Sequence, residues 1–555
     1  MKPITPNIVE SAAVQTADPV AVVEGALSRL PTDPGAIYED AALAALRAIR
    51  EKDEAAYARL CAKAKGHKTK LDKLTTPERD AHDQGIVTQT IAIAKRHCIF
   101  GHDADGRGIA IIDQDDIRQI WYVDSPGFHD WMRAAYFAET QSGISEMMLS
   151  TAIATLAAIG KYQGSEHAVY LRCAKHGDAY YIDLCDDHWR AIKVTADGWS
   201  IVLRPPTFFI RTKSMRPLPY PGAPSDLQLL WKYVNVPERL RLLVLAWLID
   251  SYRIDTPFPI LEFSGEQGTA KSTAQKRIRA LIDPNKVMLR GRPNKVEDIY
   301  VGAANNWIVS FENLSHLSPE QQDALCTLAT GGGFASRLFY TNGEEHVLET
   351  KRPVMINGIN PVATQPDLIE RDVNIEMSVI PPEDRIDEQT LEAGWEADAP
   401  AIFAGVLDLF AATLAKLPSV KLKQKFRMAD YQLLGEALAQ ALGHPPGHFT
   451  TVYQGAVTEG IDRSLETYGV AGALQALGID NRNRPWKGTV MELKASLDAL
   501  SYVDRSNWPK SPRGLSGQLK RLAPGLRKRG ISIERLGKGN TGSQLLISFL
   551  GTVET

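Results

Sequence analysis

Cysteine is scarce in this chain, and its few cysteines are scattered. The 555 residues include five of them, Cys61, Cys98, Cys173, Cys185 and Cys326. A disulfide framework needs many cysteines in a short chain, so this usage fits a reducing compartment better than an oxidising one. We therefore expect a cytoplasmic protein.

Long apolar runs and a strong net charge are also lacking. The opening residues MKPITPNIVESAAVQ contain no apolar segment of the kind a signal peptide needs. No uninterrupted apolar run approaches the roughly 18 residues that span a bilayer, so we expect no membrane partner. The net charge is -3, so any contact with nucleic acid must come from a local basic surface.

The length and the pattern of the chain predict several folded parts. A 44% hydrophobic composition is ordinary for a folded protein, and 555 residues are too many for one core. Residues 1–35 show no periodicity and are expected to be a loose tail, followed by a helical stretch. Short β-branched and aromatic runs with one helical insertion fill residues 88–215, and a proline-rich boundary follows at 215–226.

The stretch LEFSGEQGTAKSTAQKRIRALID, residues 261–283, carries the strongest motif. It matches the phosphate-loop pattern G-x-x-x-x-G-K-[ST] except that alanine replaces the second fixed glycine. Alanine is tolerable there unless the residue needs a positive φ. A strand before the loop and a helix after it favour a site for ATP. The nucleotide-binding residues expected are Gly265, Glu266, Gln267, Gly268, Thr269, Ala270, Lys271, Ser272 and Thr273.

Three downstream residues are predicted to complete a hydrolytic site. Glu312 ends the apolar run NNWIVSFE and is placed to hold Mg²⁺ together with Ser272 and to polarise the attacking water. Asn357 ends the run RPVMIN, where an amide can orient that water, although Asn-Gly at a strand end is also a common turn. Arg371 precedes an alternating strand and is a candidate finger toward the γ-phosphate of a neighbouring subunit, or else an exposed arginine.

These motifs, within about a hundred residues, resemble the superfamily 3 helicases of the AAA+ class, of the phage and plasmid primase-helicase type. The resemblance implies an ATPase that forms a homo-oligomeric ring, such as a hexamer, on single-stranded or forked DNA. It also implies that residues 328–358 form a β-hairpin that contacts DNA. Its candidate contacts are Arg337, Lys351 and Arg352, although Glu344 and Glu345 near the Thr341-Asn342-Gly343 turn would repel DNA.

The last segment is basic and has the element order of a winged helix. Helix, helix and β-hairpin patterns follow one another over residues 485–550. Between residues 510 and 540 nine basic residues face one acid, Glu534, which favours phosphate contact over a merely solvated or protein-binding face. The DNA-binding candidates here are Arg513, Lys520, Arg521, Arg527, Lys528, Arg529 and Lys538.

Two other patterns suggest alternative chemistry only weakly. Cys173 and His176, like Cys185 and His188, have a zinc-like spacing, but residues three apart on a strand point to opposite faces. The acids of HDADG (102–106) and DQDD (113–116) resemble a polymerase carboxylate pair. Too little chain precedes them for a primase domain, so we expect no primase activity.

Together these observations predict a multi-domain α/β protein with an AAA+-like phosphate-loop core. The expected parts are a helical region at 1–87, an α+β accessory domain at 88–215, the ATPase at 227–384, a helical region at 385–484 and a winged helix at 485–555. The first functional hypothesis is an ATP- and Mg²⁺-dependent DNA helicase of a phage or mobile element, acting with a primase or other replication proteins. The alternative is a regulatory protein that ATP switches onto DNA without unwinding.

Overall fold

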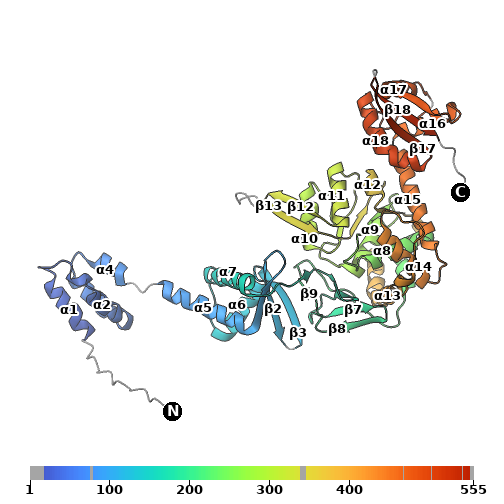
Figure 1. Cartoon of the computed structure of the whole chain (residues 1–555). Helices are drawn as coiled ribbons and strands as arrows, with labels where there is room; N and C mark the ends of the chain where they lie inside the picture. The colour runs from blue at the N-terminus through green and yellow to red at the C-terminus, as the bar shows by residue number, and fades with distance from the viewer. Residues whose placement is uncertain are drawn as a thin grey trace, which may run out of the picture. The chain divides into compact units, whose positions relative to one another are not determined.

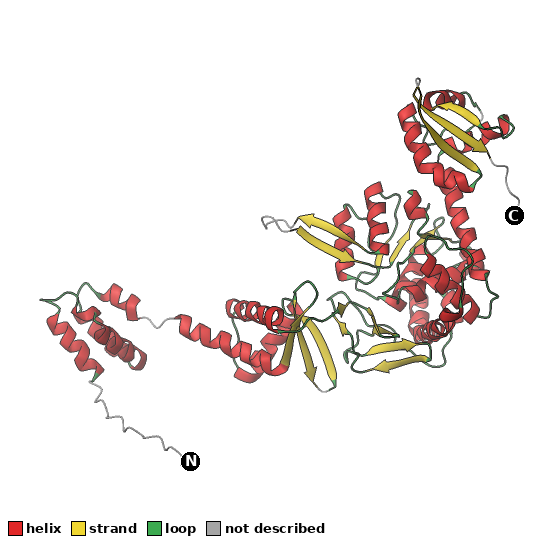
Figure 2. Cartoon of the chain, in the orientation of Figure 1, coloured by secondary structure: helices red, strands yellow, loops and turns green. Residues whose placement is uncertain are grey.

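The chain divides into two units, one whose described residues are helical and one that mixes helices and sheets (Figures 1 and 2). The computed structural model describes residues 18–75, 79–114, 116–337, 345–466, 468–501, 503–539 and 542–549. One unit comprises Met1–Arg96 with Pro126–Leu156, and the other comprises His97–Ser125 with Ala157–Thr555. The chain is therefore a multi-domain α/β protein.

The first unit is helical, and its earliest helix lies inside the expected loose tail. Asp18 caps α1 by accepting a hydrogen bond from Val20 N, and Pro19 occupies the first turn, where its missing N–H costs nothing. Val23 of α1 is buried with Leu46 and Leu60 in one apolar cluster. The helices are α1 (Pro19–Arg29), η1 (Ala36–Tyr38), α2 (Asp40–Lys52), α3 (Glu54–Lys63), α4 (Lys68–Thr75), α5 (Arg79–His97), α6 (Pro126–Thr140) and α7 (Glu146–Gln163).

The second unit begins with two antiparallel sheets. The first sheet has the order β1-β2-β3 and the second the order β5-β6-β7-β8, while β4 and β9 form a short parallel pair. The strands are β1 (Cys98–His102), β2 (Gly108–Gln114), β3 (Ile117–Tyr122), β4 (Val169–Tyr170), β5 (Cys173–His176), β6 (Ala179–Asp183), β7 (Ala191–Thr195), β8 (Gly198–Val202) and β9 (Phe208–Phe209).

The division of the chain differs from the expected accessory domain at 88–215. Ile182 of β6 and Ile192 of β7 are buried in the same apolar cluster as Leu243 and Phe403, far along the chain. The helical insertion within 88–215 belongs instead to the first unit. Local strand signals could not show this, because it depends on which apolar faces meet in space.

A four-stranded parallel sheet with the order β11-β14-β10-β15 forms the centre of the second unit. Helix α9 joins β10 to the segment that leads to β11, and a two-stranded antiparallel hairpin, β12-β13, precedes β14. The elements are η2 (Leu227–Lys232), α8 (Glu238–Asp250), β10 (Ile260–Ser264), α9 (Lys271–Ile282), α10 (Val296–Asn305), β11 (Val309–Phe311), α11 (Pro319–Thr330), β12 (Gly332–Arg337), β13 (Glu345–Thr350), β14 (Val354–Asn357), α12 (Pro366–Ile369) and β15 (Asp372–Glu376).

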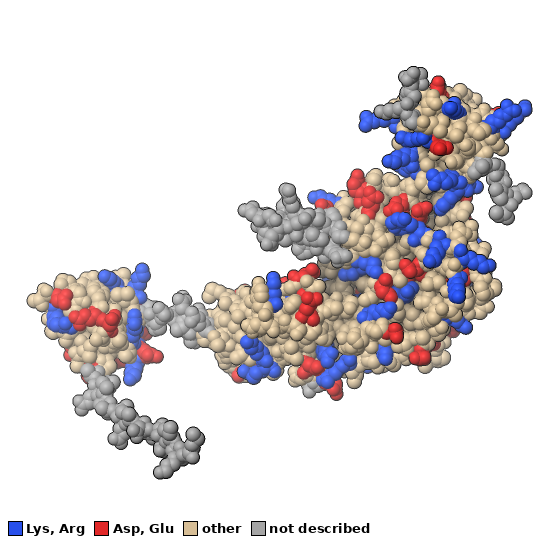
Figure 3. Space-filling view, viewed as in Figure 1, with Lys and Arg blue, Asp and Glu red and all other residues tan. Residues whose placement is uncertain are grey.

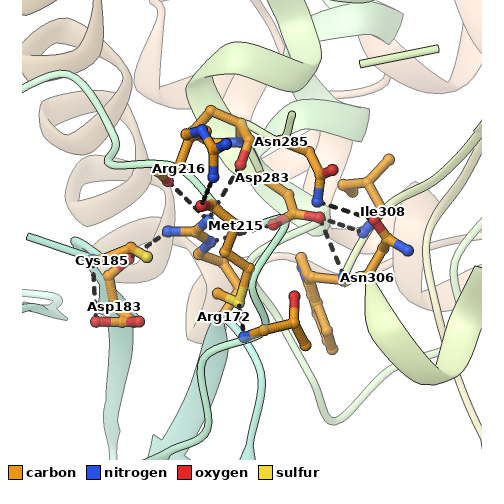
Figure 4. Close-up of polar contacts among 12 residues, drawn as sticks. Arg172, Asp183, Cys185, Met215, Arg216, Asp283, Asn285, Asn306 and Ile308 are labelled. Carbon is orange, nitrogen blue, oxygen red and sulfur yellow. Dashed lines mark hydrogen bonds and ion pairs between the residues drawn. The ribbon is translucent and has the colours of Figure 1, made fainter. Parts of the chain in front are cut away.

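A buried ion pair joins this sheet to the strand-rich segment before it (Figure 4). Arg172 and Asp283 are both fully buried, and Arg172 Nε lies 3.2 Å from Asp283 Oδ1. The other oxygen of Asp283 accepts hydrogen bonds of 3.1 Å from Trp307 N and Ile308 N, directly before β11. Arg172 also donates to Asp183 O, at 3.0 Å. One carboxylate thus holds the end of α9, the start of β11 and the strand-rich segment together.

Helices follow one another over residues 382–480. The long helix α13 is apolar and long enough to cross a membrane by composition, but 56% of that apolar window is buried inside the protein. Phe403 and Phe410 of α13 lie in the central apolar cluster, as in the core helix of a folded domain. The elements are η3 (Pro382–Asp384), α13 (Glu388–Lys416), η4 (Leu417–Ser419), α14 (Ala429–Ala441), α15 (His448–Glu466) and α16 (Gly469–Asp480).

The last part contains the helices and the hairpin in the expected order. A capping box between Thr489 and Glu492 begins α17, and Ser511 caps α18. Three strands pair in the order β16-β18-β17. The elements are β16 (Trp486–Thr489), α17 (Val490–Asp498), α18 (Pro512–Lys528), β17 (Ile531–Gly539) and β18 (Gly542–Phe549).

The Arg172–Asp283 pair predicts a large loss of stability when one partner is removed. Arg172→Met keeps the side chain's length but removes the cation nearest to the buried Asp283 and leaves it only Arg279, 3.7 Å away, which we expect to lower the free energy of unfolding by about 3 kcal/mol. As the control, Lys232→Met removes a lysine that is 60% exposed and paired with Asp398, which we expect to cost less than about 1 kcal/mol. Urea unfolding measures both, and equal losses would contradict this role of Asp283.

Candidate functional site

The segment after β10 is a tight loop with three residues at positive φ. Gly265, Gly268 and Ala270 have φ values of 142°, 85° and 59°. A Cβ on Gly265 would lie 2.7 Å from Met377 O, so only glycine fits there. Ala270 has a left-handed backbone conformation, in which alanine is a poorer fit to the motif than glycine. The conformation costs an alanine about 1–2 kcal/mol. The loop therefore needs glycine-like geometry at the position where the motif usually has glycine.

The loop presents backbone donors at the beginning of a helix. Among the described residues, none accepts a hydrogen bond from the backbone N–H groups of residues 266–270. Helix α9 begins directly afterwards at Lys271, and a helix N-terminus carries a partial positive charge. Unpaired N–H groups in front of a helix N-terminus form a site for an anion such as phosphate.

Lys271 lies folded against this loop. Its Nζ donates to the carbonyl oxygens of Gly265 and Glu266, both at 2.7 Å, and approaches Thr269 Oγ1 at 3.2 Å. Partial burial lowers the pKa of the Lys271 ammonium. A half-buried ammonium held only by neutral acceptors is stabilised by an anion at the same place.

A buried network of amides connects the loop's helix to the two neighbouring strands. Asn357 is fully buried at the end of β14, and its Nδ2 donates to Gln275 Oε1 at 2.5 Å and to Ser272 Oγ at 3.4 Å. Its Oδ1 accepts from Asn313 N at 2.8 Å. Gln275 in turn donates to Ser310 Oγ of β11 at 2.7 Å. The side chain predicted to orient water is therefore held in one orientation.

Glu312 lies at the same edge of the sheet. It directly follows β11, and its backbone N–H donates to Arg290 O at 2.8 Å. Strands β11, β14 and β10 are parallel neighbours, so Glu312, Asn357 and the loop at Gly265 all follow carboxyl ends of strands. That edge is where open α/β sheets bind their ligands.

Arg371 lies at the opposite edge of the sheet. The next residue, Asp372, pairs with Ile260 at the amino end of β10, whereas the loop follows its carboxyl end. The Arg371 side chain is 10% exposed and forms an ion pair with Asp367. A finger that reaches a neighbouring subunit needs an exposed guanidinium, so this geometry does not support the role that we expected for Arg371.

Three residues near the loop were missed in the sequence. Gln275 was read only as part of a helix. The guanidinium of Arg385 lies against Gly268, since a Cβ there would be 3.1 Å from Arg385 Nη2. Asn235 Nδ2 donates to Thr269 O at 3.2 Å and to Ser378 O at 2.8 Å. Asn235 and Arg385 come from distant segments without a motif, so only the fold brings them here.

The hairpin candidates for DNA contact have a mixed outcome. Strands β12 and β13 pair antiparallel as expected, but the turn at 341–343, Glu344 and the Arg337 and Glu345 side chains lie outside what the structure describes. Arg352 donates to Ala303 O and Asn306 O at 3.0 and 3.1 Å, which ties it to the end of α10. Burial lowers the pKa of Lys351. Neither Arg352 nor Lys351 is an exposed contact.

The basic residues of the last part fall into two groups. Arg513, Lys520 and Arg527 are exposed, and their spacing of seven residues puts them on one face of α18, opposite a buried face with Leu519 and Leu526. Figure 3 shows Lys and Arg gathered on this part of the surface.

The second group pairs within the chain. Arg521 donates to the Tyr468 hydroxyl at 3.2 Å, Lys528 lies 3.6 Å from Glu370, and Arg529 pairs with Asp462. These three cations tie α18 and the residue after it to Glu370 at the end of α12, to Asp462 of α15 and to Tyr468 before α16. The side chain of Lys538 lies outside the described residues.

The alternative metal sites are not formed by the described part of the chain. Among the residues that the structure describes, no group of three or more His, Cys, Asp or Glu is placed to hold a metal ion. Cys173 is fully buried while His176 is exposed on the same strand. Asp103 of HDADG accepts hydrogen bonds from Asp105 N and Arg107 N at 3.1 and 2.8 Å, so it braces a turn. Asp113 forms ion pairs with Arg118 and Arg204.

Two of the solved structures that match this chain are distant from it in sequence. The A-form apo structure of the NrS-1 C-terminal region matches over 83% of this chain and 98% of that chain, with 11% identity and a TM-score of 0.36. The apo structure of NrS-1 C-terminal residues 305–718 matches over 83% and 99%, with 11% identity and a TM-score of 0.37. Similarity at this level carries no argument about function. No curated protein matches the chain.

Two protein families match the second unit. Residues 227–450 match the family described as actinomycete integrative conjugative element replication protein, RepA. Residues 470–549 match the C-terminal domain of the same RepA. The first match contains the loop at 265–273 with Glu312 and Asn357, and the second contains α18. These two parts of the chain are therefore similar to the replication proteins of actinomycete integrative conjugative elements.

Proposed function

We propose that this protein hydrolyses ATP and acts on DNA during the replication of a mobile genetic element. One observation carries the proposal: within the described part of the chain, residues 266–270 present unpaired backbone N–H groups before α9, beside Lys271 and the buried Asn357 network. The replication role follows from the family description of residues 227–450. A phosphate loop explains the donors, the cation and the helix N-terminus together.

The residues present fit ATP with Mg²⁺. The N–H groups of residues 266–270 and the Lys271 ammonium would bind the β- and γ-phosphates. Ser272 Oγ and the Glu312 carboxylate would hold Mg²⁺, which takes only one or two protein ligands and neutralises developing phosphate charge. The Arg385 guanidinium against Gly268 adds a second cation from the same chain.

Hydrolysis needs a water molecule in line with the γ-phosphate. Asn357, fixed by Gln275 and by Asn313 N, would orient that water. The Glu312 carboxylate would accept a hydrogen bond from it and draw away its proton. Asn357 also contacts Ser272. The end of β14 would therefore shift when ATP is hydrolysed and the γ-phosphate leaves.

The last part supplies a surface for DNA. We interpret α17, α18 and the β17-β18 hairpin as a winged helix, with the phosphate contacts on Arg513, Lys520 and Arg527 of α18. Whether ATP drives unwinding in a ring, as the resemblance to superfamily 3 helicases implies, depends on an inter-subunit cation. Arg371, the candidate for that cation, is buried and paired with Asp367. This favours the second candidate function, a protein that ATP switches onto DNA without unwinding, as much as the helicase.

Loss of Lys271 tests the nucleotide site. We expect Lys271→Ala to lower ATP hydrolysis at least tenfold, because the phosphates lose their lysine. The control is Lys276→Ala, an exposed lysine of the same helix, which should hydrolyse ATP like the wild type. Rates are measured with and without single-stranded DNA. Absence of hydrolysis in the wild type would refute the ATPase, and hydrolysis indifferent to DNA would favour the switch over the motor.

Residue 270 tests the loop geometry. Ala270→Gly removes the left-handed strain, so we expect it to retain ATP hydrolysis. Ala270→Val puts a β-branched side chain at positive φ, which is costlier than alanine, and should reduce hydrolysis severalfold. Steady-state ATPase rates and circular dichroism compare the two variants. A Val variant as active as the Gly variant would show that the loop does not keep this conformation when it binds ATP.

Variants of the two groups of basic residues distinguish contact with DNA from pairing within the chain. The triple variant Arg513→Ala, Lys520→Ala, Arg527→Ala should weaken DNA binding and reduce the salt slope of log K by up to about 0.9 per lost phosphate contact. The control Arg521→Ala, Lys528→Ala, Arg529→Ala loses the same charge from internally paired positions and should keep that slope. Fluorescence anisotropy across a salt series measures both. Equal effects would mean that only net charge matters.

A further inference from the structure

Two buried acids lie together in the central sheet, outside the loop at 265–273. Glu262 of β10 is fully buried, and Asp372, the first residue of β15, is 9% exposed. In the register of these parallel strands Asp372 lies opposite Ile260, two residues before Glu262, so both acids project from the same face of the sheet. On the other side of β10 the residue opposite Glu262 is the uncharged Ile356 of β14. The side chains of Glu262 and Asp372 are hydrogen-bonded to each other.

This hydrogen bond requires a proton on one of the two acids. An ionised carboxylate accepts hydrogen bonds but cannot donate one, so two ionised groups cannot form the bond. Two carboxylates in contact also repel each other, and this repulsion keeps a proton on one of them. The carboxyl group of one acid must therefore donate to the carboxylate of the other.

The surrounding donors place the negative charge on Glu262. Its Oε1 accepts a hydrogen bond from Val362 N, and the Asn374 side chain also bonds to it. Burial raises the pKa of Glu262, and these hydrogen bonds oppose that effect. Burial, and then the adjacent Glu262 carboxylate, raise the pKa of Asp372 well above its usual range, against the opposing charge of Arg463. The proton of the pair thus lies on Asp372.

Helices α12 and α15 bring further charged and titratable groups near the pair. Arg463 of α15 faces Asp372, but it also lies 3.5 Å from Glu376 Oε2 of β15. Tyr453 of α15 lies near Asp372 and near Glu370, at the end of α12. A cation that is shared with Glu376 does not compensate two buried negative charges, so these surroundings favour a protonated pair.

The pair is connected to α15 and to the loop through one amide. The Asn374 oxygen accepts from Ser264 Oγ at 2.9 Å and from Arg463 Nη2 at 3.0 Å, so its Nδ2 group is the donor to Glu262. Ser264 directly precedes Gly265. A change at Glu262 therefore reaches α15 through Arg463 and the first residue of the loop through Ser264.

We propose that Glu262 and Asp372 hold a single proton, and that the resulting hydrogen bond is a latch that joins β15 and α15 to β10 and opens as the pH rises. In the closed latch the Asp372 O–H donates to the Glu262 carboxylate. Asp372 also lines a cavity of about 310 Å³, large enough for water to receive the proton. Loss of the proton leaves two negative charges in contact, which drives the side chains apart and releases Asn374. The latch does not involve the nucleotide and does not depend on the proposed ATPase.

The shared proton makes stability depend on pH in a defined direction. Below the ordinary pKa of aspartate, the folded and the unfolded chain both hold this proton. Above that pKa the unfolded chain releases it and the folded pair keeps it, so the equilibrium constant for unfolding should rise by up to about tenfold per pH unit. The rise ends when the folded pair ionises.

Asp372→Asn tests this dependence in the full chain. Its amide still donates to Glu262 but carries no titratable proton, so the variant should gain stability relative to the wild type between about pH 5 and about pH 8. Urea unfolding at each pH measures the difference. The control Glu459→Gln removes a half-exposed acid of α15 and should follow the wild type. Asp250, whose pKa burial raises to about 7, affects all three chains alike, so the comparison cancels its contribution.

A direct observation of the proton keeps the test decisive even if Asp372→Asn does not fold. In Glu262→Gln the acid beside Asp372 is gone, so Asp372 should ionise next to Arg463. The infrared difference spectrum between the wild type and Glu262→Gln at neutral pH should therefore show the C=O band of one protonated carboxyl group. A pH profile of Asp372→Asn that runs parallel to that of the wild type, or a difference spectrum without this band, would overturn the proposal.

Discussion

The buried carboxylate of Asp283 is the contact on which the centre of this structure depends. It receives Arg172 from the strand-rich segment and the backbone N–H groups of Trp307 and Ile308. A carboxylate without water needs all of these donors, because a buried charge is stable only when it is paired and hydrogen-bonded. Since Asp283 follows α9, the same contact sets where that helix ends relative to β11. The position of the loop at 265–270, at the other end of α9, then follows.

Local patterns predicted the elements well, and the reason is physical. Strand and helix periodicity, caps and turns are properties of short segments, so β10, α9, β14 and the order of the last helices could be read from the sequence. The boundary of the strand-rich region was different in the structure, because Ile182 and Ile192 share a core with Leu243 and Phe403. The helix α1 was missed because eleven residues with few polar positions show little periodicity.

In the candidate site, too, some residues are marked by local sequence patterns and others are placed only by packing. The sequence marks the strand ends and the helix start at which Lys271, Ser272, Glu312 and Asn357 lie, so their places in the fold could be predicted, and their roles stay a prediction. Gln275 looked like any helical residue, and its role depends on the spacing between α9 and β11. Arg371 looked exposed from its acidic neighbours, yet Asp367 one helical turn away binds it. Side-chain partners across elements are set by packing, which one sequence does not display.

The contacts of Asp283 and Gln275 explain how Ala270 can keep a strained backbone conformation. An alanine with φ of 59° relaxes unless both ends of its segment are held. Here β10 is buried between β14 and β15, and α9 is fixed at its far end by Asp283 and in its first turns by Gln275. Strand β10, helix α9 and Asn235 thus impose the loop's shape, and Ala270 adopts the strained backbone conformation that this shape requires. A loop whose curvature is imposed from outside presents its N–H groups inward before any ligand arrives, which lowers the ordering cost of binding phosphate.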